Sequence, residues 1–278
     1  MSRPVVVITG GAGGMGLATA KIMGADYHVL ITDVDQARLD AAVTALAGLE
    51  VSTAVCDVTD RLAVQAAFDQ AATLGPVSSV VHTAGLSPLM GSADQIMRVN
   101  ALGTINVTRA ALPLAHEGSA VVNVASIAGH MLPSLVRPKK AFKLALSDPS
   151  AATDKLVASV QRGPAKMRPA SAYSVSKAFV IWYSAHMAAA FGERGGRIVS
   201  VSPGSFDTPM GRLEEKSGSA KLVEFAALKR FGRPEEVAEV LAFCAGPKPG
   251  YLTGVDILVD GGTQQGLTLR GMLSMARG

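Results

Sequence analysis

Tyr173 and Lys177 are the residues of this chain whose types and spacing are best suited to proton chemistry. A Tyr-x-x-x-Lys spacing places both side chains on one face of a helix, one turn apart. A nearby ammonium group favours the phenolate form of tyrosine, so such a phenol can act as a general base near neutral pH. Because the pair alone is weak evidence, its meaning depends on the rest of the chain.

A glycine-rich turn follows the apolar run Val5–Ile8 and reads Thr9, Gly10, Gly11, Ala12, Gly13, Gly14, Met15, Gly16. Glycines allow a tight turn there and let backbone N–H groups approach a pyrophosphate at the positive end of the next helix. Together with the Tyr–Lys pair, this turn indicates a nucleotide-binding oxidoreductase.

Asp33 follows a second apolar run and lies 17 residues beyond Gly16. At this position a carboxylate receives the adenosine ribose hydroxyls and repels a 2′-phosphate. No arginine or lysine interrupts the glycine turn, so the sequence predicts NAD rather than NADP as the cofactor. In the alternative interpretation Asp33 caps the next helix, a role that Asp35 could fill instead.

Short runs rich in valine and isoleucine alternate with segments of helical spacing, which predicts an α/β fold with a doubly wound parallel sheet. The expected strands are Val5–Thr9, His28–Thr32, Val51–Cys56, Ser79–Thr83, Ala120–Ala125, Ile198–Ser202 and Val255–Val259. The expected helices are 15–24, 36–47, 60–73, 94–115, 171–192 and 234–245. With no linker or repeat, residues 1–278 are expected to form a single Rossmann-type domain of about seven strands.

Segment 130–170 interrupts this alternation of strands and helices. It carries eight basic residues against two acidic ones, although the net charge of the whole chain is only +4. Asp148 as cap and Pro149 as first residue predict a helix start, and 139–146 is a second candidate helix. We interpret the segment as a basic helical insertion. An anionic substrate group, a partner subunit or solvent could each face its charges.

Composition excludes several other classes of protein. The chain has a mean hydropathy of +0.31 but no uncharged apolar span of 18 residues, and no secretory signal is evident. Cys56 and Cys244 fit no metal or redox spacing, so reduced thiols in a cytoplasmic protein and no bound metal are expected. Phe142 is the one aromatic residue in the basic segment, which disfavours nucleic-acid binding.

In sequence order, these motifs resemble the classical short-chain dehydrogenase/reductase family over nearly the whole chain. The resemblance identifies a catalytic set of Asn100, Ser126, Tyr173 and Lys177. It implies that the cofactor is bound by the glycine turn (Thr9, Gly10, Gly14, Met15 and Gly16), by Asp33, Asp57, Val58, Ala84 and Gly85, by Tyr173 and Lys177, and by Pro203, Gly204 and Thr208.

The chain departs from the family pattern at two places. Thr83 replaces the asparagine of Asn-Ala-Gly, and Ser126 stands 47 residues before Tyr173, where the family keeps about a dozen. The extra residues are the basic segment, which resembles the insertion of 3α-hydroxysteroid dehydrogenase/carbonyl reductase-type members. Ser171 is a nearer serine, but it starts the tyrosine helix, so Ser126 is preferred.

The resulting hypothesis is hydride transfer between NAD(H) and a secondary alcohol or ketone on an apolar, steroid-like skeleton. Segment 208–230 is expected to form a substrate lid, although its apolar residues could equally fasten it to the body. A 3-hydroxyacyl thioester is the second substrate class, and a non-enzymatic NAD-binding regulator is the rival function. The resemblance also implies a homo-oligomer, dimer or tetramer, with no membrane partner. The tail Leu267–Gly278 could cover a site or fray.

Overall fold

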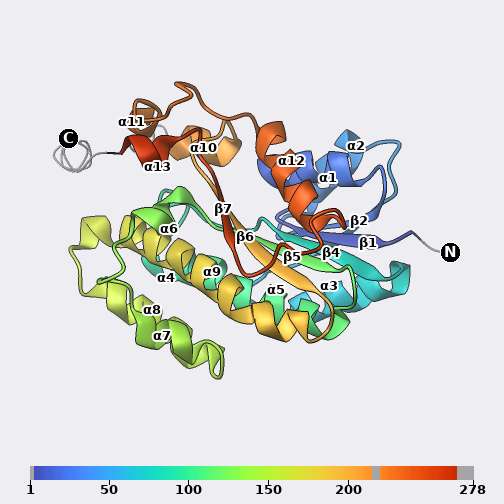
Figure 1. Ribbon diagram of the computed structural model, residues 1–278, viewed down its shortest axis with the longest axis horizontal. Helices are drawn as coiled ribbons and strands as arrows, with labels where there is room; N and C mark the ends of the chain where they lie inside the picture. Colours follow the sequence, from blue (N-terminus) through green and yellow to red (C-terminus); the bar gives the residue numbers. More distant parts are fainter. Residues whose placement is uncertain (1–2, 215–219, 268–278) are drawn as a thin grey trace.

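The computed structural model describes residues 3–214 and 220–267, and its centre is one seven-stranded parallel sheet (Figure 1). The strand order is β3-β2-β1-β4-β5-β6-β7. The strands are β1 (Val5–Thr9), β2 (His28–Asp33), β3 (Val51–Val55), β4 (Val77–His82), β5 (Ala120–Val124), β6 (Arg197–Pro203) and β7 (Asp256–Val259). The single-domain, doubly wound fold expected from the sequence is confirmed.

Helices cover both faces of the sheet, so its central strands are buried on both sides. One face carries α1 (Gly14–Met23), α2 (Gln36–Ala45) and α12 (Pro234–Ala245), which pack over one apolar cluster. The other carries α3 (Arg61–Leu74), α4 (Ala93–Met97), α5 (Gly103–Ala111) and α9 (Arg168–Gly192), which pack over a second. The helix α9 is the one that brings Tyr173 and Lys177 to the sheet.

The helical stretch expected over 94–115 is confirmed, but it is not one regular α-helix. After α4, a π-helical turn η1 (Arg98–Leu102) precedes α5, and a 3₁₀ turn η2 (Leu112–Leu114) follows it. A π turn holds more residues per turn than an α-helix, and the apolar pattern of the sequence does not reveal it. Asn100 lies in this π turn, which places a site residue at the irregular part of the helix.

Segment 130–170 forms two helices near the expected positions, and they pack against the tyrosine helix. That the segment is an insertion stays a prediction. After the short helix α6 (Ile127–Met131) come α7 (Lys139–Leu144), α8 (Pro149–Gln161) and a 3₁₀ turn η3 (Ala165–Met167). Asp148 caps α8 through the N–H of Ala151, at 3.0 Å. The helix α9 begins at Arg168, three residues before the expected start. The lysines of α7 are exposed to solvent.

Segment 208–230 contains two short helices, α10 (Pro209–Glu214) and α11 (Ala220–Val223), and Gly218 between them lies outside the described residues. After β7, the chain forms α13 (Thr263–Gly266), and the tail beyond Leu267 is likewise outside the described part.

Within the described residues, no helix is both long and apolar enough to cross a bilayer, and no three acidic, histidine or cysteine side chains gather as a metal site. Cys56 and Cys244 are buried free thiols, and burial raises the pKa of each to about 11. Neither thiol is therefore a reactive nucleophile at neutral pH.

Candidate active site

The predicted site residues gather at the carboxyl edge of the parallel sheet. Thr9 ends β1, Asp33 ends β2 and Pro203 ends β6, while Ser126 lies two residues beyond the end of β5. Parallel strands present their carboxyl ends on one side, and open α/β sheets bind ligands there. Positions that are far apart along the chain therefore lie along one edge of the sheet.

Close backbone contacts shape the glycine turn. Gly10 has φ +64°, and a Cβ built on it would lie 2.8 Å from the backbone of Ala84. A Cβ on Gly16 would lie 2.7 Å from the hydroxyl of Thr83, and that hydroxyl donates to the carbonyl of Thr9, at 2.7 Å. Any side chain at either glycine would therefore push the turn away from the loop after β4. Thr83, which departs from the family asparagine, itself fastens β1 to β4.

The start of α1 has the features of an anion-binding helix end. Gly13 provides no side-chain cap, and the first turn contains no acidic residue, whereas α2, α3 and α8 are each capped by an aspartate. Thr208 lies over this end, since a Cβ on Gly14 would come within 3.0 Å of its methyl group. Backbone N–H groups of the first turn are thus left for a ligand, and the turn fits a dinucleotide pyrophosphate.

Asp33 is buried at the end of β2, and its Oδ1 lies 3.2 Å from Nη1 of Arg38. Arg38 also approaches the glycine turn, because a Cβ on Gly13 would lie 3.4 Å from its Nη2. Asp35 caps α2 through the N–H groups of Ala37 and Arg38, at 2.8 and 3.3 Å. The capping role therefore belongs to Asp35, whereas Asp33 pairs with Arg38 and its contact with a ribose stays a prediction. No arginine or lysine interrupts the glycine turn in the sequence, but Arg38 approaches it from α2.

Ser126 is the N-cap of α6, and its Oγ accepts from the N–H of Ala128 at 3.2 Å. The helix α6 packs directly on α9 at Lys177. A Cβ on Gly129 would lie 2.8 Å from the backbone carbon of Lys177 and from the nitrogen of Ala178. Glycine at 129 therefore permits the close approach that brings the serine helix beside the lysine.

Lys177 is 6% exposed, and its Nζ lies 5.8 Å from the centre of the Tyr173 ring. Nζ also donates to the carbonyl of Val124, the last residue of β5, at 2.9 Å. The ammonium is thus fixed between the tyrosine and the strand that leads to Ser126. Tyr173 itself is half-buried.

Asn100 ties the loop after β4 to the tyrosine helix. Its Oδ1 accepts from the N–H of Leu86 at 2.8 Å, and its Nδ2 donates to the Leu86 carbonyl at 3.0 Å and to Ser176 Oγ at 3.2 Å. Ser176 donates in turn to the backbone carbonyl of Tyr173, at 2.9 Å. Gly85 lies between these groups, since its Cβ would be 3.2 Å from Asn100 Oδ1 and 3.5 Å from Lys177 Nζ.

A buried histidine links the cofactor turn to the same region. Thr9 Oγ1 lies 2.6 Å from Nδ1 of His82, and His82 Nε2 lies 3.1 Å from Oγ1 of Thr104. Thr104 donates its own proton to the carbonyl of Asn100, at 2.7 Å, so its oxygen accepts from Nε2–H. Burial, and secondarily the Lys177 charge, lowers the pKa of His82 to about 3. The imidazole is therefore neutral.

The remaining predicted cofactor residues lie at the edges of this arrangement. Asp57 is exposed, and its Oδ1 accepts from the N–H and the hydroxyl of Thr59, while Val58 is buried beneath Gly103. Gly204 lies against the backbone of Asp260, and Met15 packs into the apolar cluster under α1. Ligand contacts of these four residues stay a prediction.

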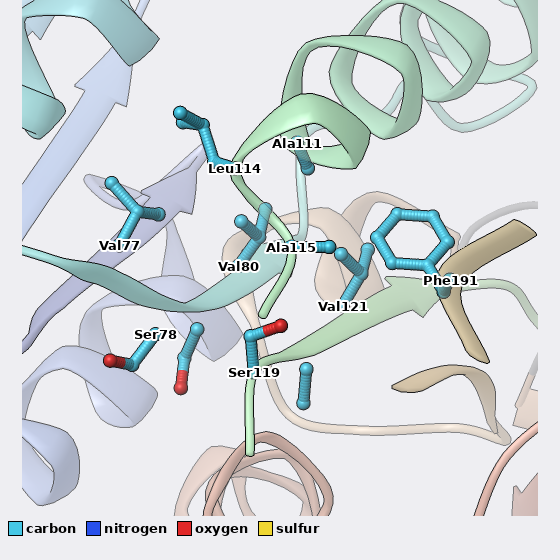
Figure 2. A pocket seen from close by; sticks show the side chains of 11 residues that line it. Val77, Ser78, Val80, Ala111, Leu114, Ala115, Ser119, Val121 and Phe191 are labelled. Atoms are coloured by element: carbon cyan, nitrogen blue, oxygen red, sulfur yellow. The ribbon is translucent and has the colours of Figure 1, made fainter. Parts of the chain in front are cut away.

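The cavity in Figure 2 lies at the other end of the strands. It holds about 10 Å³, roughly one water, between the first residues of β4 and β5, with Leu114 and Phe191 in its wall. It is too small for a substrate and is remote from the carboxyl edge, so it is not the active site.

Comparison with known proteins identifies the family of the chain. Residues 4–154 match the family model described as short chain dehydrogenase, and residues 155–264 match one described as enoyl-(acyl carrier protein) reductase. The chain belongs to the short-chain dehydrogenase/reductase family. It is accordingly an oxidoreductase that binds a nicotinamide cofactor.

Relatives span nearly the whole chain. A short-chain dehydrogenase/reductase of Alternaria brassicicola is 35% identical over 94% of this chain and 96% of its own length. A 3-oxoacyl-[acyl-carrier-protein] reductase of Thermotoga maritima is 29% identical, covering 93% and 96%. A solved short chain dehydrogenase from Burkholderia cenocepacia in complex with NADP is 26% identical, with a TM-score of 0.74, covering 95% and 98%.

Four residues of the site escaped the sequence analysis, namely Arg38, His82, Gly129 and Ser176. Ser176 carried a possible signal, because it stands three residues after Tyr173 and therefore shares a face of the helix with it. His82 stands in a largely apolar strand, where a buried polar side chain is expected to have a hydrogen-bond partner. Gly129 gave no signal, because it contacts a distant segment. Arg38 gave none either, because its pairing with Asp33 depends on the turn between β2 and α2.

Proposed function

We propose that the chain is an NAD(H)-dependent oxidoreductase that interconverts a secondary alcohol and a ketone on an apolar substrate. The observation that carries the proposal is the fixed placement of Lys177 beside Tyr173, with the ammonium held by the end of β5. The cofactor, when bound, would supply or accept the hydride. All other steps fall to side chains of this chain.

Tyr173 would exchange a proton with the substrate oxygen, and Lys177 would stabilise its phenolate. Ser126 accepts from the Ala128 N–H, so its hydroxyl proton is available to a substrate oxygen. The carboxamide of Asn100 is hydrogen-bonded to Leu86 and Ser176, which supports a role in holding the loop after β4 and the tyrosine helix together. A rival NAD-binding regulator would have no need of this set.

The choice of NAD is supported by the buried carboxylate of Asp33, which would accept hydrogen bonds from ribose hydroxyls and repel a 2′-phosphate. Arg38 offsets part of that charge. The preference for NAD over NADP should therefore be smaller than an isolated aspartate would produce.

The decisive variant is Tyr173→Phe. We expect it to lower kcat by about 10²–10⁴-fold, the usual contribution of a positioned acid or base, while NADH binds as before. Tyr251→Phe, at a fully exposed tyrosine outside the site, is the matched control and should keep full turnover. Turnover retained in Tyr173→Phe would disprove the assignment.

The substrate class is tested by following NAD⁺ reduction with steroid alcohols, aliphatic secondary alcohols and 3-hydroxyacyl-coenzyme A thioesters. A thioester is the second candidate, favoured by the exposed lysines of α7 and by similarity to the Thermotoga reductase. Only the anionic thioester should show a KM that rises strongly with salt. We further propose a homo-oligomer, which light scattering of the purified protein would test.

A further inference from the structure

The short helix that begins at Ser126 is fastened at its other end by a histidine. His130 lies in the last turn of α6, and its Nε2 is 2.7 Å from Oδ2 of Asp256, the first residue of β7. The Asp256 side chain is 9% exposed and that of His130 is 29% exposed. The contact therefore joins the serine helix to the sheet in a largely buried place.

Asp256 is held firmly enough to serve as an anchor. Its Oδ1 accepts from the hydroxyls of Ser200 and Ser202, at 2.5 and 3.0 Å, and both serines are fully buried on β6. Ser200 also pairs in register with Asp256 across the sheet. One carboxylate oxygen thus faces the strand and the other faces α6, so the carboxylate cannot turn without losing hydrogen bonds.

We propose that His130 is a positioning residue that fixes Ser126 through Asp256; this rests on the proposed function, in which Ser126 faces the substrate oxygen. A five-residue helix has too few internal hydrogen bonds to hold its own geometry. Ser126 and His130 stand four residues apart, so a displacement at one end of α6 moves the other end. On its other side α6 meets the α9 backbone at Gly129.

The test compares His130→Ala with His130→Gln. Alanine removes the donor to Asp256, and we expect kcat to fall about tenfold from the misplaced serine, with the Kd of NADH unchanged. Glutamine carries an amide N–H at nearly the reach of Nε2, so it should restore most of kcat. His116→Ala, at an exposed histidine before β5, is the matched control and should leave both quantities unchanged.

Amide hydrogen exchange over residues 126–131 of the protein without cofactor gives a readout that does not depend on turnover. We expect exchange to be faster in His130→Ala and near wild type in His130→Gln, with α9 unaffected. Unchanged exchange in the alanine variant, or glutamine no better than alanine, would overturn the proposal. A wild-type protein that turns over no substrate would instead refute the proposed function, and the exchange comparison would still decide whether His130 holds α6.

Discussion

The guanidinium of Arg38 lies 3.2 Å from the carboxylate of Asp33, so two residues expected to favour opposite cofactors form one ion pair. Asp33 is buried at the end of β2, whereas the Arg38 side chain is half exposed and also approaches Gly13. A carboxylate here disfavours a 2′-phosphate, and a neighbouring guanidinium favours it. We therefore expect cofactor choice to depend on the pair rather than on Asp33 alone.

Arg38→Ala should increase discrimination against NADPH. Without the guanidinium, Asp33 repels the 2′-phosphate more strongly, and we expect the ratio of the NADPH Kd to the NADH Kd to rise about fivefold, or roughly 1 kcal/mol. Asp33→Asn should lower the same ratio. Fluorescence titration of each reduced cofactor measures both constants. Arg194→Ala, at an exposed arginine before β6, serves as the control, and an unchanged ratio in Arg38→Ala would show that the pair does not act on the cofactor.

Gly129→Ala should disturb the site through a single methyl group. The new Cβ would meet the backbone of Lys177 and Ala178 at 2.8 Å, and backbone cannot give way as a flexible side chain can. We expect a loss of about 1–3 kcal/mol in the free energy of unfolding and a lower kcat, because α6 must move away from α9. Urea denaturation and steady-state kinetics measure the two effects.

Gly192→Ala is the matched control for that substitution. Gly192 ends α9, and a Cβ added there meets nothing within 4 Å. Alanine should be neutral or stabilise by up to about 1 kcal/mol, since glycine is the poorer helix former. Equal losses in the two variants would show that Gly129 matters only as a helical residue.

Local patterns of the sequence predicted the strands, the capped helix and the glycine turn, but not the contacts between separate elements. Val5–Thr9 was found because both faces of the strand are apolar, and Asp148–Pro149 revealed the start of α8 because capping is local. The glycine turn and the Tyr173–Lys177 pair are likewise local patterns. The π turn at Asn100 left no periodic signal. The partners of His82 come from distant elements and could not be read from spacing. The pairing of Arg38 with Asp33 depends on the turn between β2 and α2, which periodicity does not describe.

Phe142→Ala should reveal how much the packing of α7 on the tyrosine helix contributes to stability. Phe142 is 1% exposed, and its ring lies 5.3 Å from that of Phe179 and 5.6 Å from that of Trp182. We expect a loss of about 3–5 kcal/mol on unfolding, from lost burial and the cavity left behind. Leu135→Ala in the same segment, at a side chain 93% exposed, should change stability little. A small effect in Phe142→Ala would mean that α7 packs only loosely.

His82 should make the fold sensitive to acid. Its pKa is about 3 in the folded protein, mainly because of burial, against 6.5 for an ordinary histidine. At a pH between these two pKa values, the imidazole binds a proton in the unfolded chain but not in the folded chain. Protonation of His82 therefore costs no stability above pH 6.5. As the pH drops toward 3, it lowers the free energy of unfolding, by about 5 kcal/mol at most.

The measurement is urea denaturation of the wild type and of His82→Asn from about pH 7 down to about pH 4. The variant should be less stable at neutral pH, because Thr9 and Thr104 lose their shared partner, but its stability should decline less as the pH falls. Carboxylates titrate in both proteins, so the difference between the two curves isolates the imidazole. His116→Asn should follow the wild type, because that histidine is exposed. Parallel curves for wild type and His82→Asn would mean that the buried imidazole accepts a proton in the folded protein, and that the neutral link from Thr9 to Asn100 is wrong.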